Sequence, residues 1–462
     1  MKRKWLAIAL SMVMAVGMLS GCGNDKPAAS TAPSGGNDAE VTENPEAPAL
    51  ETIADGGGKT LSIWSWDTSI QDRIKDYLPS YKDGKIGDVK VEFNIQSDND
   101  KIIYQQKLDE AIEAQKGGGE AQVDLFCAER DFAGKYAMAA RDAAYAVEQI
   151  GITEDDIAKT AGNALKKDEN GKVRGINLEG NAAGMIFKKS IAKDALGTDD
   201  PTEVQNMCSS WDGMKEVGEK LKAKGYFLHQ TPDDMQRAFI MSDETPFGEN
   251  DTLTVTPGMD AWIDYAKDCC DKGYVAVPGA QMFGDEYMSG FGKKGKTFSY
   301  AFVNWFNGWP LPGNADDAKG DWCLIAGPQP FSWGGTFMFA ANGTDNADLC
   351  KEVITGLATD AANLEAWAKD GNYTSNSEVN AKFGGKPAES GFYSNDDYFG
   401  TLDELAALDT TQGGGSAYDS ECVEKAWPIF ADYFSGKESD KAACVGKWQD
   451  EVIKTWANLS KG

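Results

Sequence analysis

Tryptophans that stand beside acids or glycines are the residues whose types and spacing could bind a ligand in this chain. Trp66 is followed at once by Asp67, and Trp305 and Trp309 stand four positions apart. Trp333 precedes two glycines. An indole offers a flat apolar face, whereas a carboxylate or amide fixes hydroxyl groups, so such a set suits a neutral polyol with an apolar C–H face. Acids and amides at other predicted strand ends complete the candidate set: Glu129, Asp131, Glu179 and Asn181.

A single tryptophan is more often part of a core than a platform for a ligand. We therefore expect Trp64, deeper in its strand, to be buried, and Trp66, at the end of that strand beside Asp67, to face the ligand. Trp322, which precedes a predicted strand, and the C-terminal Trp448 are expected to be structural.

The elements that position these residues alternate between strand and helix. Hydrophobic patterning predicts strands at 61–66, 89–95, 123–126 and 297–303, and helices at 70–78 and 104–115. The stretch 173–187 is apolar on both sides of a break at Glu179-Gly180-Asn181. This alternation indicates an α/β fold with a largely parallel sheet, and ligands of such sheets bind at the carboxyl ends of the strands.

The sequence patterns that would indicate a metal site, a phosphate-binding loop or a catalytic site are incomplete or lie in the wrong order of elements. His229 is the single histidine, so a metal site with two histidines is impossible. Residues 290–297, GFGKKGKT, match a phosphate-binding loop, but that loop must follow a strand and open a helix. Here a helical stretch precedes the loop and a β-rich run follows it. We therefore expect a basic loop there, no resident cofactor and no dedicated metal site. The abundance of acids neither establishes nor excludes a pair of catalytic carboxylates.

The composition limits the class of partner. The formal net charge is −28 and 41% of residues are hydrophobic. A chain this acidic is a poor partner for nucleic acid or an anionic membrane surface, since both are polyanions. The hydrophobic content is sufficient for a substantial core, so the chain is expected to fold.

The first residues predict export. Lys2, Arg3 and Lys4 precede an apolar run from Trp5 to Leu19, which is typical of a secretory signal peptide over residues 1–21. The closing Leu-Ser-Gly-Cys resembles the bacterial lipobox, in which Cys22 becomes the lipidated N-terminus. An ordinary signal peptide with an incidental cysteine is the alternative. Residues 22–58 then read as a flexible tether on the outer face of the cell membrane.

Eight further cysteines leave the thiol state open. An even number in an exported chain is compatible with disulfides, yet no Cys-x-x-Cys pair occurs. Cys269 and Cys270 share a predicted helical face with Trp262 and Tyr265. We therefore favour mostly free, buried thiols.

The order of several motifs along the chain resembles the family 1 extracellular solute-binding proteins, the maltose-binding-like receptors of carbohydrate ABC importers. The motifs, from the lipobox onwards, are LSIWSWD at 61–67, DLFCAERDFAGKY at 124–136, Asp233-Asp234 with Arg237, GPQPFSWGGTFMFAANGTDN at 327–346 and AWAKDGNYTSNSEVN at 366–380. A further stretch, GKVRGINLEGNAAGMIFKKSIAKDALG, spans 171–197. The resemblance covers essentially all of residues 59–462. Arg174 and Asn177 depart from it, because such proteins often carry an aromatic residue and a proline there.

The resemblance implies a two-lobed periplasmic-binding-protein-like (type II) fold with a ligand cleft between the lobes. By carry-over, residues 59–178 and 330–371 form the first lobe, and residues 179–329 and 372–462 form the second. Trp66, Asp67, Glu129 and Asp131 would then line the first lobe's edge of the cleft. Glu179 and Asn181 would lie at the hinge, Trp305 and Trp309 on the second lobe, and Trp333 near a returning crossing.

The function implied is capture of a sugar or oligosaccharide by a monomeric lipoprotein, without catalysis, and its delivery to a membrane permease. Two alternatives stay open from the residues alone. A surface-anchored glycoside hydrolase would also need tryptophan platforms and two acids. A receptor for a cationic peptide or polyamine would suit the negative charge.

Overall fold

The computed structural model describes residues 50–96, 101–117, 122–243, 245–409 and 418–462. The predicted signal peptide (1–21), the lipidation site Cys22 and most of the predicted tether lie outside the described residues. Within the described part, no helix has the length and apolar character needed to cross a membrane.

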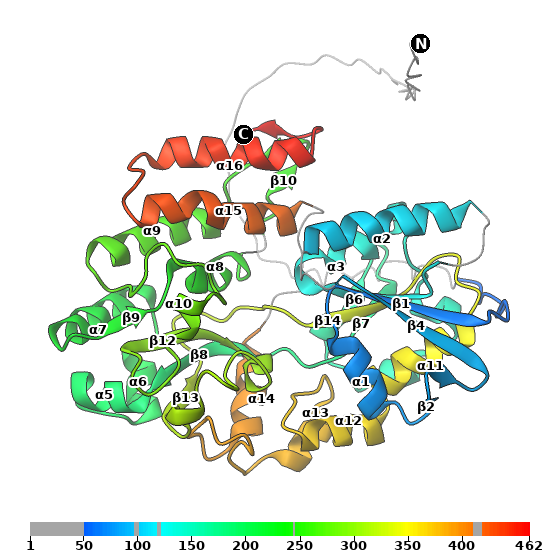
Figure 1. Cartoon of the computed structure of the whole chain (residues 1–462), viewed down its shortest axis with the longest axis horizontal. Helices are drawn as coiled ribbons and strands as arrows, with labels where there is room; N and C mark the ends of the chain where they lie inside the picture. Colours follow the sequence, from blue (N-terminus) through cyan, green and yellow to red (C-terminus); the bar gives the residue numbers. More distant parts are fainter. Residues whose placement is uncertain (1–49, 97–100, 118–121, 244, 410–417) are drawn as a thin grey trace, which may run out of the picture. The chain divides into compact units, whose positions relative to one another are not determined.

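The described strands form one large sheet, one smaller sheet and a short three-stranded sheet near the C-terminus (Figure 1). The large sheet has the order β2-β3-β4-β1-β5-β14-β7-β6 and the smaller one the order β13-β8-β12-β9. The strands of the large sheet are β1 (Thr60–Ser65), β2 (Tyr81–Lys82), β3 (Lys85–Ile86), β4 (Val89–Ile95), β5 (Leu125–Glu129), β6 (Leu165–Lys167), β7 (Val173–Asn177) and β14 (Thr336–Ala340). Those of the smaller sheet are β8 (Ala183–Lys188), β9 (Phe227–His229), β12 (Thr297–Val303) and β13 (Trp322–Ile325), and those of the short sheet are β10 (Gly248–Glu249), β11 (Thr252–Leu253) and β15 (Ser460–Lys461).

Helices surround both sheets, and Figure 1 shows α15 between α9 and α16, in keeping with its contacts to both. The helices are α1 (Ser69–Tyr77), α2 (Lys101–Lys116), α3 (Arg130–Ala137), α4 (Glu154–Ile157), α5 (Lys189–Leu196), α6 (Pro201–Met207), α7 (Trp211–Ala223), α8 (Pro232–Ile240), α9 (Pro257–Asp271), α10 (Asp285–Met288), α11 (Ala347–Ala358), α12 (Ala361–Lys369), α13 (Ser377–Asn380), α14 (Tyr398–Leu408), α15 (Asp419–Phe434) and α16 (Lys441–Thr455).

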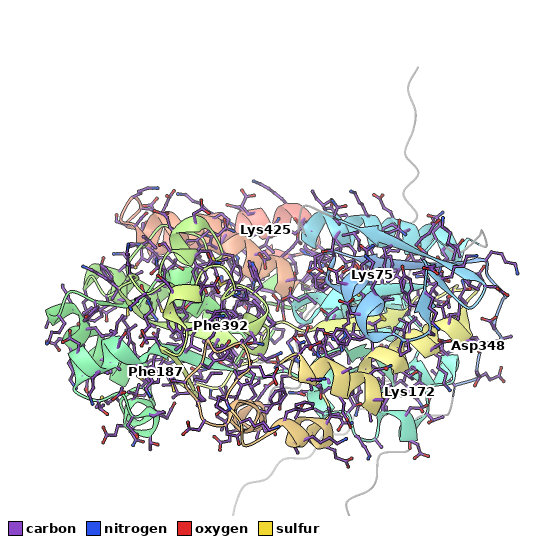
Figure 2. The ribbon with its side chains drawn as sticks, turned by 60° about the horizontal axis from the view of Figure 1, so that its bottom comes forward. Lys75, Lys172, Phe187, Asp348, Phe392 and Lys425 are labelled. Carbon is purple, nitrogen blue, oxygen red and sulfur yellow. The ribbon has the colours of Figure 1, made fainter. Side chains whose placement is uncertain are left out.

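Separate hydrophobic cores divide the body into two lobes. The first lobe is built on the large sheet, whose core includes Ile63, Phe126 and Phe339. The second lobe is built on the smaller sheet and holds two adjoining clusters, one around Trp262 and one around Trp322. In Figure 2 the labelled Phe187 and Phe392 belong to the second lobe, whereas Lys75 and Lys172 belong to the first.

The chain passes between the sheets at residues 178–182, from β7 to β8, and returns at residues 326–335, from β13 to β14. Helix α12 contacts α1 and α11 of the first lobe, and α13 follows it and contacts α14, which packs on β8. Residues 370–376 therefore make a third connection.

The prediction of a parallel sheet is confirmed for β1, β4 and β5, the strands on which it rested, but it is wrong for the large sheet as a whole, which is mixed. Strand β1 runs parallel to β4 and to β5, but β14 runs antiparallel to both β5 and β7. The reason is that β14 enters the sheet from the second lobe rather than through a local helical crossover. The third predicted strand is also shifted, because β5 ends at Glu129, so that Glu129 closes the strand instead of following it.

Residues 50–58, which the sequence assigns to the tether, are bound to the first lobe. The Ile53 N–H donates to the Gln149 carbonyl at 2.8 Å, and the Gly58 N–H donates to the Asp345 carbonyl at 3.1 Å. The Ile53 side chain packs against the first-lobe core. The folded body therefore begins before Ile53 rather than at Lys59.

The glycine-rich loop that resembles a phosphate-binding loop runs from α10 to β12, as its sequence context predicts. Three of its carbonyls point to a buried positive charge. The buried Lys188 ammonium donates to the carbonyls of Gly290, Gly292 and Gly295 at 2.9, 2.6 and 2.9 Å. The loop therefore encloses a cation of the protein itself, which is the opposite of a phosphate site.

The eight described cysteines are all unpaired, in agreement with the sequence interpretation. Seven are buried and Cys270 is intermediate. Burial raises the pKa of the Cys208, Cys269 and Cys270 thiols to about 12, so they stay protonated at neutral pH.

Candidate functional site

Three of the predicted ligand-binding tryptophans meet where the second lobe contacts the crossing from β13 to β14. The ring centroids of Trp305 and Trp333 are 5.1 Å apart in an edge-to-face arrangement, and those of Trp305 and Trp309 are 6.0 Å apart and nearly parallel. Trp305 and Trp309 follow β12, and Trp333 lies in the connection from β13 to β14. Exposure rises from 3% at Trp333 to 47% at Trp309, so the group runs from the core to the surface.

The two glycines after Trp333 let the backbone pass close under these rings. Gly334 has φ +73°, and a Cβ there would lie 2.5 Å from the Trp305 indole nitrogen. From the first lobe, Arg130 donates through Nε to the Gly334 carbonyl at 3.1 Å, and its backbone N–H donates to the Gly335 carbonyl at 3.2 Å. A side chain at position 334 would push the rings away from this connection.

A buried ion pair joins the lobes beside the tryptophans. Arg237 on α8 contacts Asp131 on α3 at 2.5 Å, and their side chains are 5% and 1% exposed. Arg237 also contacts Glu424 on α15 at 2.8 Å. Its guanidinium carbon lies 5.8 Å from the centre of the Trp333 ring. Asp131 thus belongs to the same site as the tryptophans, although it comes from the other lobe.

Two unsatisfied polar atoms belong to this pair, and a third lies at the end of β7. Among the described residues, Asp131 Oδ1, Arg237 Nε and Asn177 Nδ2 are buried without a hydrogen-bond partner. An unsatisfied buried polar atom costs about 1–3 kcal/mol, so such atoms call for a reason. A hydrogen-bond donor and a hydrogen-bond acceptor that both lack a partner suit a ligand whose groups can accept and donate hydrogen bonds.

Carboxylates from several elements face Arg130. Burial lowers the pKa of the Arg130 guanidinium, and the charges of Asp409, Asp131, Glu129 and Glu179 oppose that shift. Burial also tends to lower the pKa of Arg237, but Asp131, Glu424 and Glu129 more than offset it and raise the pKa. Both guanidiniums therefore stay charged at neutral pH.

Glu179 lies where the chain leaves the first lobe. Burial raises the pKa of its carboxyl, while Arg73 and hydrogen bonds from Thr336 act in the other direction. Arg73 donates to the Leu178 carbonyl and, at 2.8 Å, to the Leu357 carbonyl, so it fixes the same crossing. Asp67 adds a further negative charge that raises the pKa of Glu179.

The neighbouring residues tie the crossings to one another. Asn181 Nδ2 donates to Ser332 Oγ at 2.6 Å and to Asp409 Oδ2 at 2.9 Å. The Gly180 N–H donates to the Tyr373 carbonyl at 2.9 Å, and a Cβ at Gly180 would lie 2.3 Å from the Thr374 carbonyl oxygen. Asn181 therefore connects the first and second crossings, and Gly180 connects the first and third.

Trp66 and Asp67 are placed differently from the other candidates. Trp66 is only 7% exposed and packs edge-on against Tyr104 and Phe132, at centroid distances of 6.1 and 5.8 Å. Trp64, expected to be buried, is instead half-buried. The Asp67 carboxylate accepts hydrogen bonds from the Ser69 N–H and hydroxyl, at 2.9 and 2.6 Å, at the start of α1. Both residues have structural partners, and their contact with a ligand stays a prediction.

The sequence reasoning missed two residues of this site. Arg237 was noted within a motif but not as a site residue, although its i, i+4 spacing from Asp233 places both on one face of α8. Phe283 carried no signal, because it stands in a loop outside every predicted element. Its ring centroid lies 4.5 Å from that of Trp309.

A separate polar hollow of about 620 Å³ lies on the first lobe, between α1, α4, α11 and α12. Asp155, Asp156, Glu352 and Asp360 are among the residues that line it. The residues lining it include no member of the predicted site, so this hollow is distinct from the tryptophan group.

Comparison with known families accounts for this arrangement. The sequence model of the bacterial extracellular solute-binding proteins matches residues 80–388, which is more than half of the chain. This chain is a bacterial extracellular solute-binding protein. A comparison with curated protein sequences finds no match.

Solved structures of other solute-binding proteins share the fold of this one. A family 1 extracellular solute-binding protein superposes with a TM-score of 0.69 at 15% identity, covering 86% of this chain and 99% of that one. The galacto-N-biose-/lacto-N-biose I-binding protein of an ABC transporter from Bifidobacterium longum, in complex with lacto-N-biose, gives 0.64 at 13% identity, covering 88% and 100%. The ABC transporter associated binding protein of B. animalis subsp. lactis, in complex with beta-1,6-galactobiose, gives 0.63 at 16% identity, covering 87% and 99%. The solute-binding protein therefore has the two-lobed α/β fold that its sequence predicts.

Proposed function

We propose that this solute-binding protein captures a sugar or oligosaccharide between its lobes and delivers it to the permease of an ABC importer. The observation that carries the proposal is the meeting of Trp305, Trp309 and Trp333 with the ion pair of Asp131 and Arg237. Aromatic faces and charged hydrogen-bonding groups stand side by side there, and they come from both lobes.

The chemistry of a neutral polyol suits this site. The C–H face of a pyranose ring covers an indole face and removes apolar surface from water. Hydroxyl groups both donate and accept, so they can satisfy Asp131 Oδ1 and Asn177 Nδ2, which have no partner among the described residues. The solved neighbours with lacto-N-biose and beta-1,6-galactobiose support a saccharide as the ligand class.

The proposed site comprises the residues predicted from the sequence, to which Arg237 is added. The full set is Trp66, Asp67, Glu129, Asp131, Glu179, Asn181, Trp305, Trp309, Trp333 and Arg237. The lobe bounds remain those proposed from the sequence, 59–178 with 330–371 and 179–329 with 372–462, with the start of the first lobe moved to include Ile53. A ligand that touches both lobes favours the conformation in which they close, so occupancy shifts the population toward that form.

Export and anchoring belong to the same proposal. Residues 1–21 act as a signal peptide, Cys22 carries the lipid, and the monomeric receptor is held at the outer face of the membrane. Tethering raises its effective concentration near the permease. Replacing Cys22 by serine should release the protein from membranes in the producing cell, which fractionation and immunoblotting would measure, and a variant that stays membrane-bound would contradict lipid anchoring.

A titration of intrinsic tryptophan fluorescence tests the binding function. Purified protein is titrated with a panel of neutral mono- and oligosaccharides and, in parallel, with cationic peptides and polyamines. We expect saturable binding of at least one sugar with a Kd below about 1 mM, the value that corresponds to about 4 kcal/mol of binding free energy. Saturable binding of a cationic ligand alone would instead support the polyamine or peptide receptor.

A turnover assay tests the proposed absence of catalysis. The proposal assigns Asp131, which is paired with Arg237 through Oδ2, to ligand binding rather than to bond cleavage. Incubating the protein with each oligosaccharide of the panel should yield no new reducing ends. Release of reducing ends at a rate proportional to protein concentration would establish a glycoside hydrolase.

A further inference from the structure

Phe283 adopts an unusual backbone conformation beside the proposed site. Its φ is +66°, in the left-handed region that residues other than glycine seldom occupy. Such a conformation is unfavourable for a residue with a Cβ and persists only where the surroundings hold it. Phe283 lies in the segment between α9 and α10, and its side chain is half-buried.

A buried carboxylate holds this segment from the first turn of α8. Asp233 Oδ2 accepts the Met282 N–H at 2.9 Å, one residue before Phe283. Asp233 is itself buried. Asp233 also faces Arg237, one turn along α8, so the helix that carries the ion pair between the lobes also supports the Phe283 loop.

The ring of Phe283 touches all three tryptophans of the proposed site. Its centroid lies 4.5 Å from Trp309, 6.0 Å from Trp333 in a nearly parallel arrangement, and 6.0 Å from Trp305. Phe283 therefore connects the buried Trp333 with the exposed Trp309, and part of its own apolar surface is still accessible.

The geometry points to Phe283 as a ligand-contacting residue of the sugar site, held in place by Asp233 as its positioning residue. The ligand class is a saccharide whose ring presents an apolar C–H face to Phe283 while an adjoining part lies on Trp309. This inference rests on the proposed function, and it explains why a strained half-buried ring is retained there. Covering the accessible ring surface with a sugar face removes apolar area from water.

The first test removes the Phe283 ring by a substitution that tolerates the positive φ of this position. Glycine adopts a positive φ readily, so F283G should leave the loop unstrained. We expect F283G to weaken binding of the best sugar of the panel at least tenfold in calorimetric titration. The control is F383A, which removes another half-buried phenylalanine, one that packs on Phe399. Its affinity should stay within twofold of wild type.

Binding by F283G within twofold of wild type, while wild type and F383A bind, would overturn the role of Phe283 and leave the proposed function standing. If wild type binds no sugar, the proposed function fails, and the inference fails with it.

The second test isolates the positioning role of Asp233. An asparagine at position 233 keeps an oxygen that can accept the Met282 N–H, whereas an alanine does not. We expect D233A to weaken sugar binding severalfold and D233N to restore affinity to near that of wild type. The double variant D233A/F283G should bind no more weakly than F283G alone, because Asp233 acts through the ring. Additive losses in the double variant, or failure of D233N to restore binding, would contradict this role.

Discussion

At the scale of single residues, the tryptophans assigned to the ligand differ in what surrounds them. Trp66 is enclosed by Tyr104 and Phe132 in the first-lobe core, whereas Trp309 is 47% exposed beside Phe283. Two tryptophans that each follow or close a strand segment of the chain therefore have different environments. Sequence position alone could not separate them, because burial depends on which helix packs against the strand end.

Replacing each of these tryptophans by alanine should separate packing from binding. W66A is expected to lower the free energy of unfolding by about 3–5 kcal/mol, since it removes a large side chain from a packed core. W309A, at the surface, should change it by less than about 1 kcal/mol. Denaturation followed by circular dichroism measures both. Equal losses in the two variants would contradict the assigned environments.

The ion pair of Asp131 and Arg237 should behave as a coupled unit. Removing one partner leaves the other charge buried, which costs about 3–5 kcal/mol. We expect R237M to be strongly destabilising and the double variant R237M/D131N to be more stable than the sum of the single losses predicts. Urea denaturation of the two single variants and the double variant gives the coupling energy. A coupling energy of zero would mean that the pair does not form in solution.

Asp234 gives a prediction about pH. Burial raises the pKa of its carboxyl to about 7, although the carboxylate accepts hydrogen bonds from Ala301 and Tyr287. Between pH 3.8 and about 7, the Asp234 carboxyl is therefore protonated in the folded state and ionised in the unfolded chain. The contribution of Asp234 to the free energy of unfolding is therefore full below pH 3.8 and is lost as the pH rises through about 7.

The comparison with D234N isolates this group, since asparagine does not titrate. The melting temperature of wild type relative to D234N should fall between pH 4 and pH 8, as differential scanning fluorimetry would measure. A difference in melting temperature that stays constant across that range would contradict a raised pKa of the Asp234 carboxyl in the folded state.

At the scale of elements, the loop from α10 to β12 shows how a motif can mislead. Its glycines provide carbonyls for Lys188, and the ammonium also lies 5.1 Å from the centre of the Trp322 ring. The sequence shows the glycines and the wrong order of elements, so it excludes a phosphate loop. It does not show the lysine, which comes from β8, about a hundred residues earlier in the chain.

Removing the Lys188 ammonium should leave three loop carbonyls without their donor. Each unsatisfied buried carbonyl costs about 1–3 kcal/mol, so K188M is expected to destabilise the second lobe severely. K294M, in the exposed part of the same loop, is the matched control and should be neutral. Thermal denaturation measures both variants, and a K188M melting temperature equal to that of K294M would contradict the cation-enclosing role of the loop.

Most individual helices and strands can be predicted from local hydrophobic patterning, whereas the connections between them cannot. β4 and β12 have the bounds that hydrophobic patterning predicts, and α1 and α2 lie within a few residues of theirs. The antiparallel insertion of β14 depends on a crossing between lobes, about which neighbouring residues carry no information. The same holds for the site: the tryptophans were found by type, whereas Arg237 and Phe283 become site residues only through the tertiary fold.

At the scale of the whole molecule, the unpaired cysteines predict the chemical behaviour of the native protein. Burial keeps the thiols protonated and out of reach, so a thiol reagent should react with the folded protein at Cys270 first and at the seven buried cysteines only slowly. In guanidinium chloride all eight should react. Fewer than eight reactive thiols after unfolding without reductant would indicate a disulfide.

The two lobes meet through contacts that a ligand could use or replace. Arg237 reaches Asp131 from the second lobe, and Asn181 and Gly180 tie the crossings together. The proposed site is therefore complete only where both lobes contribute, and in our proposal this couples ligand capture to lobe closure.

Calorimetric titration of wild type and W305A with the best sugar of the panel tests this account most directly. Trp305 contacts Trp309, Trp333 and Phe283, so it is central to the proposed platform. We predict one binding site with a Kd below about 1 mM in wild type, and at least tenfold weaker binding in W305A with a melting temperature near wild type. No sugar bound by wild type below about 1 mM, or equal affinities in the two proteins, would contradict sugar capture at this site.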